Sequence, residues 1–316
     1  MKTILLLTLL ISSLFSIDIK QPIGHFTSNG AVIDLVYRGG KVYAATDAGS
    51  VDIFDFKSRQ LIKKIKVQKI KDFLGDDIDS KVYSVDILDD KILILSQTKQ
   101  GFRRVHIHQD NKTELIIDFT KALTISKAKF LDKSTILLAL LSNELISYDI
   151  KKARQNWLIQ VSGAKFSDFS LNKKKSEVVI ADESGDLEII STKDGRHIKT
   201  LSGQNLDNVF QVDYKNSIIA TAGKDRKAVI YRPKLNSAYY KKSNFFIYSV
   251  GLSPSGAKVA YSSDENNNVS IFNTRTKASL GLFGGNKTNL SKIVFINEDE
   301  FLVSGYNKTI NLYSLR

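Results

Sequence analysis

The sequence predicts an all-β protein: a seven-bladed β-propeller of four-stranded blades, with the ring closed by the N-terminal strand. A short apolar segment recurs seven times, beginning at residues 51, 105, 145, 187, 228, 269 and 310, so five of the six spacings are 40 to 42 residues. Between these segments lie short strands separated by Gly, Asn, Asp, Ser and Lys clusters, without the apolar spacing of helices. A period near 41 residues built from such strands is typical of propeller blades.

Each repeat divides into four strands, as the fifth repeat illustrates. Residues 209–214 form its inner strand, 217–222 the second, 228–232 the third and 238–242 the outer one. The third strand contains Ala228-Val229-Ile230-Tyr231, which is apolar at consecutive positions. Blades stack face to face, so their middle strands are covered on both sides and lose the alternation of a half-exposed strand.

The two ends of the chain predict how the ring closes. The last repeat ends on its third strand, at residues 311–316, and lacks an outer strand. Residues 17–26 precede the first inner strand, 31–37, and have no repeat of their own. We therefore expect this N-terminal segment to complete the last blade, which removes two open sheet edges. The alternative is an open or six-bladed arrangement with a disordered N-terminus.

The repeat resembles that of the WD40 family. The family's S-P-x-G turn is matched by Ser253-Pro254-Ser255-Gly256, and its turn aspartate by Asp225. The same turn position holds Asp47, Asp182 and Asp264 in other repeats, with Asn143 and Asn307 as weaker matches. The resemblance runs from about residue 20 to the end of the chain and implies the propeller fold, not an activity.

The sequence departs from the WD40 pattern at the Trp-Asp pair that ends the third strand. That pair is replaced by Phe54-Asp55, His108-Gln109, Tyr148-Asp149, Ile190-Ser191, Tyr231-Arg232, Phe272-Asn273 and Tyr313-Ser314. The family's Gly-His pair occurs only as Gly24-His25. We therefore do not expect the family's buried His-Asp network in every blade.

The first sixteen residues have the plan of a secretory signal peptide. Lys2 provides a positive start, residues 4–14 form the apolar region, and the small residues Ser12, Ser13 and Ser16 lie near its end. This division gives a signal peptide at 1–16 and the propeller at 17–316. The apolar stretch is too short for an ordinary transmembrane anchor, although an uncleaved anchor is the alternative. We expect a periplasmic monomer without stable membrane insertion.

The chain is basic and contains no cysteine, which rules out disulfides. Its 46 Lys and Arg against 33 Asp and Glu give a net charge of +13, or +12 without Lys2. Such a charge fits nucleic acid, anionic lipid or an acidic protein, and export makes nucleic acid an unexpected partner. Turns such as Lys151-Lys152 and Lys173-Lys174-Lys175 also serve solubility, and both explanations stay open.

No catalytic or metal-binding constellation is evident in the sequence. The four histidines are His25, His106, His108 and His197. His106 and His108 lie two apart on a strand and share a face, but a metal site needs three or four ligands. We find no nucleophile elbow and no phosphate-binding loop. The sequence therefore predicts a protein that is not an enzyme and has no cofactor.

The second repeat is enlarged, since the first spacing is 54 residues. The extra residues lie in 66–80 and in 98–102, two connections that emerge at the same end of a propeller. Connections of this length are often functional. We expect an enlarged rim that contacts a partner protein, with Phe73 as anchor; its members are Lys69, Lys71, Phe73, Asp76, Asp77, Arg103 and Arg104. The alternative is that Phe73 and Leu74 pack onto the blade.

Over its whole length the chain resembles the WD40-type accessory proteins of the periplasmic nitrate reductase system. The resemblance lies in the general run of the sequence, including residues 33–56, IDLVYRGGKVYAATDAGSVDIFDF. It implies a non-catalytic scaffold in maturation or electron supply of that enzyme, with nitrate reductase components as partners. The alternatives are a propeller enzyme or cofactor carrier of anaerobic respiration, and an outer-membrane assembly scaffold.

Overall fold

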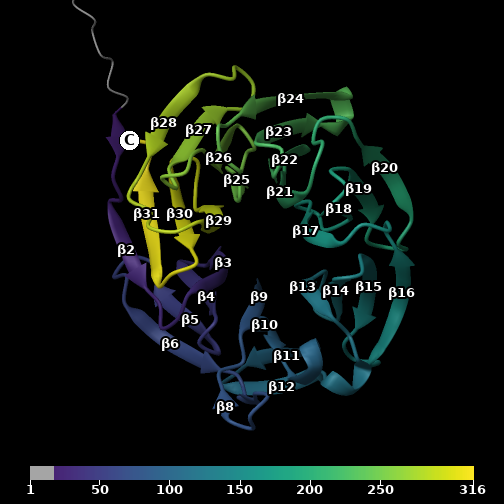
Figure 1. Cartoon of the computed structure of the whole chain (residues 1–316). Coiled ribbons are helices and arrows are strands. Elements are labelled where there is room, and N and C mark those ends of the chain that lie inside the picture. The colour runs from purple at the N-terminus through teal and green to yellow at the C-terminus, as the bar shows by residue number, and fades with distance from the viewer. Residues whose placement is uncertain (1–17) are drawn as a thin grey trace, which may run out of the picture.

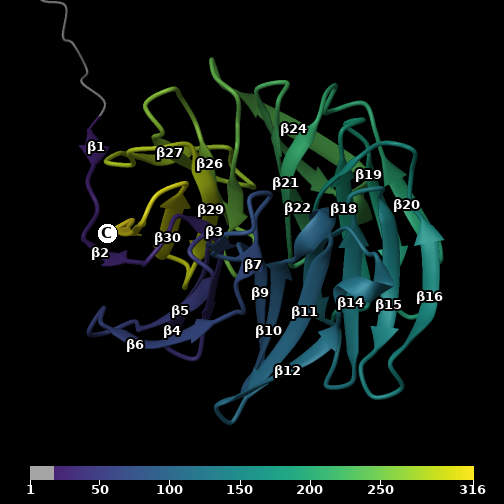
Figure 2. The same ribbon diagram turned by 60° about the horizontal axis from the view of Figure 1, so that its bottom comes forward.

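The computed structural model describes residues 18–316, which form seven four-stranded sheets arranged around a central axis (Figure 1). The predicted signal peptide therefore lies outside the described residues. Figure 2 shows the strands of each blade running between the two faces of the ring. No helix within residues 18–316 is long and apolar enough to cross a membrane.

The first four blades follow the chain without interruption. Blade one contains β3 (Val32–Arg38), β4 (Lys41–Thr46), β5 (Ser50–Asp55) and β6 (Leu61–Lys66). Blade two contains β9 (Val82–Leu88), β10 (Lys91–Gln97), β11 (Arg103–Gln109) and β12 (Lys112–Ile117). Blade three contains β13 (Ile125–Phe130), β14 (Thr135–Leu140), β15 (Glu144–Asp149) and β16 (Arg154–Gln160). Blade four contains β17 (Phe166–Leu171), β18 (Glu177–Asp182), β19 (Leu187–Ser191) and β20 (His197–Leu201).

The remaining blades confirm the predicted strand division. Blade five contains β21 (Val209–Lys215), β22 (Ile218–Gly223), β23 (Lys227–Arg232) and β24 (Ser237–Lys242). Blade six contains β25 (Val250–Leu252), β26 (Lys258–Ser262), β27 (Val269–Asn273) and β28 (Ser279–Phe283). Blade seven contains β29 (Leu290–Phe295), β30 (Glu300–Gly305) and β31 (Thr309–Ser314) from the end of the chain.

The N-terminal segment closes the ring, as predicted. Strand β2 (Gly24–Thr27) pairs antiparallel with β31 and places Phe26 opposite Ile310, giving the order β2-β31-β30-β29 in blade seven. One detail differs from the expectation. The preceding strand β1 (Ile19–Lys20) pairs parallel with β28 and adds a fifth strand to blade six. The segment therefore ties together the last two blades.

The core lies between the blades, not within them. In the described part of the chain, seven apolar clusters each join two neighbouring blades. In β23, Ala228, Val229 and Ile230 are all fully buried, and they divide between the two clusters on either side of blade five. This arrangement is the physical reason for a strand that is apolar on both faces.

Side-chain amides and hydroxyls form hydrogen bonds with one another at two places in the ring. The side chain of Asn205 accepts hydrogen bonds from the Thr221 hydroxyl at 2.9 Å and the Tyr231 hydroxyl at 3.3 Å. Two blades later, the Asn286 side chain accepts hydrogen bonds from Asn311 at 2.9 Å and Tyr313 at 3.1 Å. Amide and hydroxyl side chains therefore satisfy part of one another's hydrogen-bonding needs in these two blades.

Candidate functional site

The enlarged connection between β6 and β9 forms a small hairpin outside blade two. Its strands are β7 (Ile70–Lys71) and β8 (Asp77–Ile78), and an ion pair of 3.0 Å joins Lys71 to Asp77. Figure 1 shows β8 at the periphery of the ring beside blade two. The Asp72 carboxylate orders the turn by accepting hydrogen bonds from the backbone N–H groups of Leu74 and Asp76, both at 2.9 Å.

The hairpin turn presents two apolar side chains to solvent. Phe73 is 99% exposed and Leu74 is 79% exposed. The alternative in which these side chains pack onto the blade therefore does not occur. A short, closed turn limits the backbone freedom of Phe73, so less entropy would be lost when a partner covers the ring. Lys69, Lys71, Asp76 and Asp77 surround this turn as exposed charges.

The two predicted arginines connect the hairpin segment to the blade. Arg104 is only 6% exposed and donates hydrogen bonds to the Gln68 carbonyl at 2.8 Å and the Gln97 carbonyl at 3.2 Å. Arg104 therefore ties the connection at 66–80 to the end of β10, where the second enlarged connection begins. Arg103 lies with its guanidinium 4.0 Å from the centroid of the Tyr83 ring. Arg104 therefore has a structural role, and the residues of the hairpin turn form the exposed part of the rim.

A polar ring that the sequence analysis missed lines the central channel. Inner strands contribute Asp34, Ser84, Lys127, Asp168, Gln211 and Lys292 to the walls of a cavity of about 190 Å³. Lys127 lies 2.6 Å from Asp168, and Lys292 lies 4.0 Å from Asp34 and 3.9 Å from Asp168. The ring therefore brings together charges from blades one, three, four and seven.

The carboxylates of this ring also join neighbouring inner strands. Asp34 in blade one accepts a hydrogen bond from the backbone N–H of Val85 in blade two at 3.0 Å. Asp168 in blade four likewise accepts from Val212 in blade five at 3.2 Å. Asp86 and Asp213 repeat this bond towards the next blade, to Phe130 at 2.8 Å and Leu252 at 2.9 Å. These aspartates therefore hold the blades together around the axis.

Burial and charge set the protonation of the channel groups. Burial alone would raise the pKa of Asp168, but Lys127 and Lys292 outweigh it and hold that pKa below its usual value. Burial lowers the pKa of Lys127 to about 8, although the Asp168 carboxylate opposes this shift. The carboxylates are thus ionised at neutral pH, and their charge is matched inside the ring. The channel wall is built for cohesion between blades.

His106 and His108 have separate partners on strand β11. The Nε2 atom of His106 lies 3.3 Å from the Ser96 hydroxyl, and burial together with the charge of Arg104 lowers the pKa of His106 to about 4. His108 Nδ1 lies 2.8 Å from the Thr113 hydroxyl, and its Nε2 lies 2.9 Å from the Lys63 ammonium. Residues 18–316 contain no group of three or more His, Asp or Glu placed to hold a metal ion.

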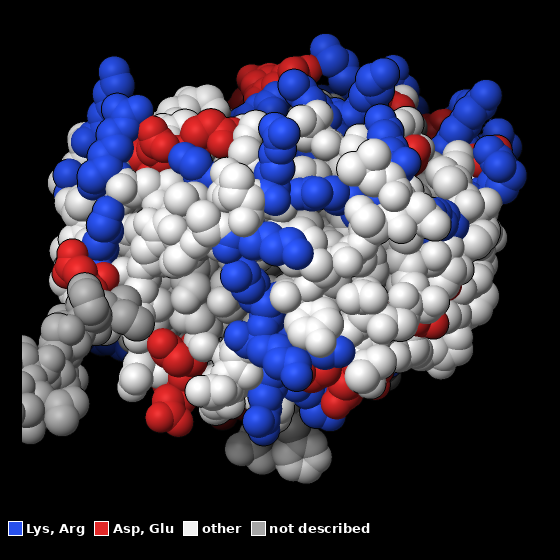
Figure 3. Space-filling view, turned by 90° about the horizontal axis from the view of Figure 1, so that it is seen from above, with Lys and Arg blue, Asp and Glu red and all other residues white. Residues whose placement is uncertain are grey.

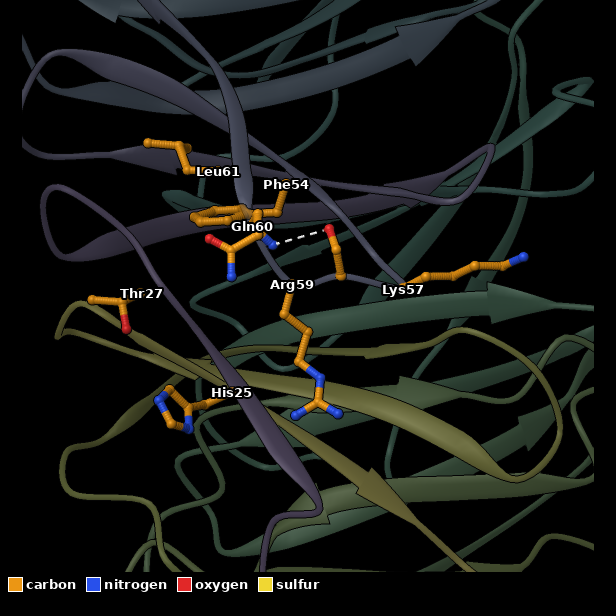
Figure 4. A pocket seen from close by; sticks show the side chains of 8 residues that line it. His25, Thr27, Phe54, Lys57, Arg59, Gln60 and Leu61 are labelled. Atoms are coloured by element: carbon orange, nitrogen blue, oxygen red, sulfur yellow. Dashed lines mark hydrogen bonds between the residues drawn. The ribbon is translucent and has the colours of Figure 1, made fainter.

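A second, more open pocket of about 500 Å³ lies at the seam where blade seven meets blade one. His25 and Thr27 come from β2, whereas Lys57 and Arg59 come from the turn before β6 (Figure 4). The Arg59 guanidinium lies against Gly24, where a Cβ atom would overlap it. Within residues 18–316, the side chains of His25, Lys57 and Arg59 form no ion pair. The seam is therefore basic, exposed and weakly enclosed.

The channel ring did leave a signal in the sequence. Lys127 and Asp168 are 41 residues apart, and Asp168 and Gln211 are 43 apart, which matches the repeat period. Each occupies the same place in its inner strand, next to a shift of register with the second strand. Aligning inner strands by this place would have predicted a polar ring.

Comparisons with known proteins support the fold. No family model matches the chain, and no curated protein matches its sequence. Among solved structures, the β-propeller domain of Cps50 (Swd1) from Myceliophteria thermophila superposes with a TM-score of 0.73 at 14% identity, covering 92% of this chain and 99% of that one. The chain has the fold of a seven-bladed WD40-like β-propeller. At this level of identity the likeness concerns the fold alone.

Proposed function

We propose that this WD40-like propeller is a non-catalytic scaffold for protein–protein contacts, exported to the periplasm as an accessory or maturation factor of periplasmic nitrate reductase. The observation that supports a scaffold is the exposed hairpin turn with Phe73 and Leu74 on a rigid ring. The assignment to nitrate respiration rests on the resemblance of the whole sequence to accessory proteins of that system.

The channel supports a structural role for the ring centre. Its charged groups are matched to one another and to backbone groups of neighbouring blades. A scaffold needs a rigid frame with loops that recognise partners. The blade-two rim supplies an apolar centre at Phe73 and Leu74, surrounded by the exposed charges of Lys69, Lys71, Asp76 and Asp77. An apolar anchor within a polar border is the usual composition of a transient interface.

Affinity capture from periplasmic extract tests this function. We expect tagged protein to retain nitrate reductase components, identified by mass spectrometry, and the double variant Phe73→Ala/Lys71→Ala to lose them. The matched control is Leu206→Ala/Lys224→Ala, which removes an exposed leucine and a surface lysine in the loops next to blade five. Equal capture by both variants would remove the rim from the interface.

Two further measurements address location and the alternative functions. Cell fractionation should place the mature protein in the periplasm, and recovery in the cytosol would contradict export. The visible absorbance spectrum of protein purified from its native host separates a scaffold from a haem carrier. A Soret band that co-purifies with the propeller would favour the cofactor-carrier alternative.

A further inference from the structure

The positive charge of the chain is concentrated in blades five and six. Residues 209–283, which make up these two blades, contain 11 Lys and Arg but only four acidic residues, so they carry +7 of the net charge of +13. Figure 3 views the side of the ring that carries β24 and β28. Lys and Arg form a band through the middle of this side, bordered mainly by uncharged atoms.

Cationic and aromatic side chains gather at the junction of these blades, and we refer to this cluster as the basic groove. The groove consists of Arg232, Tyr239 and Lys241 from blade five and Phe272 and Lys277 from blade six. The ring centroids of Tyr239 and Phe272 are 6.3 Å apart. Both the Tyr239 hydroxyl and the Arg232 guanidinium donate hydrogen bonds to the Thr274 carbonyl. Blade five is therefore tied to blade six beneath the groove.

Aromatic rings position the cations of the basic groove. The Lys277 ammonium lies 4.5 Å from the centroid of the Tyr239 ring, and the Arg232 guanidinium lies 5.9 Å from it. The Lys241 ammonium lies 5.6 Å from the centroid of Phe272. Cation–π contacts restrict these long side chains without neutralising them. Binding of a ligand to these side chains therefore costs less conformational entropy than binding to freely rotating surface lysines.

The charge of the basic groove is not balanced by the protein itself. In the described part of the chain, no carboxylate lies within 4 Å of the charged groups of Arg232, Lys241 or Lys277, nor of the flanking Lys234 and Arg275. Like charges crowded on one surface repel each other, and an anionic ligand relieves that repulsion. The geometry points to an anion-binding surface that spans two blades.

We propose that the basic groove binds an acidic segment of a partner protein. Single-stranded nucleic acid adds the stacking of its bases on free aromatic faces to its phosphate contacts, but the cations of the groove already cover Tyr239 and Phe272. A membrane surface requires apolar side chains that insert between lipids, and Phe272 is only 3% exposed. What the groove offers is a row of positioned cations, which suits carboxylates.

This surface is distinct from the blade-two rim, and its test does not depend on the proposed role in nitrate respiration. The probe is fluorescein-labelled dodecaglutamate, titrated with the full chain and followed by fluorescence anisotropy at low salt. The groove variant is Lys234→Gln/Lys241→Gln/Lys277→Gln. The control variant, Lys151→Gln/Lys173→Gln/Lys174→Gln, removes the same charge from exposed turns of blades three and four.

We expect the groove variant to bind dodecaglutamate about tenfold more weakly than the unmodified protein. The affinity of the control variant should fall by less than about twofold. Lys241→Arg should retain binding because it keeps the charge. Absence of binding to the unmodified protein, or equal loss in both triple variants, would overturn the proposal. Oligothymidylate and phosphatidylglycerol vesicles are titrated in parallel. Groove-dependent binding of either one that is tighter than that of dodecaglutamate would show that the occupant is not an acidic peptide.

Discussion

The Lys127 ammonium in blade three lies 2.6 Å from the Asp168 carboxylate in blade four, in the wall of the central channel, where Asp168 is buried and Lys127 is largely buried. Lys127 also donates a hydrogen bond to the Phe169 carbonyl at 2.8 Å. The second Asp168 oxygen accepts a hydrogen bond from Val212 in blade five. One ion pair therefore connects three consecutive blades, and its removal should lower the free energy of unfolding of the whole ring.

Asp168→Asn should destabilise the protein by about 3 kcal/mol, because it preserves the shape of the side chain but leaves the Lys127 charge buried without a counter-charge. Chemical unfolding followed by the fluorescence of the single tryptophan, Trp157, measures this loss. Adding Lys127→Met should recover part of the stability, since no unpaired charge then remains.

The control for the buried pair is an exposed one. Glu183→Gln breaks the ion pair between Glu183 and Lys165, whose side chains are 47% and 60% exposed. Exposed pairs contribute little, so the expected change is below about 1 kcal/mol. If Asp168→Asn were as mild as Glu183→Gln, the channel ring would not be what holds the blades together.

His106 should make the fold sensitive to moderately acidic pH. Burial and Arg104 lower its pKa from 6.5 to about 4 in the folded state. Between these pH values the unfolded state binds more protons, so the folded state loses stability as the pH falls from about 6.5 to 4. A shift of this size corresponds to about 3 kcal/mol.

Urea unfolding at pH 7, 5.5 and 4 measures this dependence. We expect the wild-type protein to lose about 3 kcal/mol more than His106→Gln over this range, because glutamine cannot take up the proton. Groups that titrate alike in both proteins cancel in the comparison. Parallel pH dependences for the two proteins would show that His106 is not the group responsible.

Gly251 in β25 should tolerate no side chain. A Cβ atom there would lie 2.5 Å from the Ile293 carbonyl oxygen in β29, so the inner strands of blades six and seven would have to separate. We expect Gly251→Ala to cost about 2 kcal/mol. Gly163→Ala is the matched control, since a Cβ atom at position 163 meets no atom within 4 Å. Its effect should stay within about 0.5 kcal/mol. Thermal unfolding of both variants tests this prediction. An equal loss of stability in both would mean that any loss of glycine is costly and that the contact with Ile293 is not the cause.

The sequence was informative wherever the repeat itself carries the signal. The consecutive apolar residues Ala228 to Tyr231 predicted blades covered on both faces, and the missing outer strand of the last repeat predicted closure by the N-terminus. Pairing of β1 with blade six was not predicted, because two residues such as Ile19 and Lys20 contain no periodicity that specifies a partner strand.

The functional surfaces were less predictable because they combine residues from distant parts of the chain that become neighbours only when the ring closes. Spacing placed the two enlarged connections at one end, but not which rim residue turns inward. Arg104 faces Gln68, which lies 36 residues earlier in the chain, and no local pattern distinguishes it from the neighbouring Arg103. Lys129 likewise lies 3.5 Å from Asp34, although 95 positions separate them. Such pairs follow from closure of the ring and require its geometry.

One side chain of the N-terminal strand, Phe26, should contribute several kilocalories per mole to the free energy of unfolding. Phe26 is 1% exposed and packs edge to face on Phe54, with ring centroids 5.6 Å apart, and it stacks on Phe56 with centroids 6.2 Å apart. Phe26→Ala should cost about 3 to 4 kcal/mol, because it opens a cavity at the seam between blades seven and one. His25→Ala, an exposed change on the same strand, should cost less than about 0.5 kcal/mol. Urea unfolding measures the stability of both variants. A small loss of stability in both would mean that β2 lies on the ring without contributing to its closure.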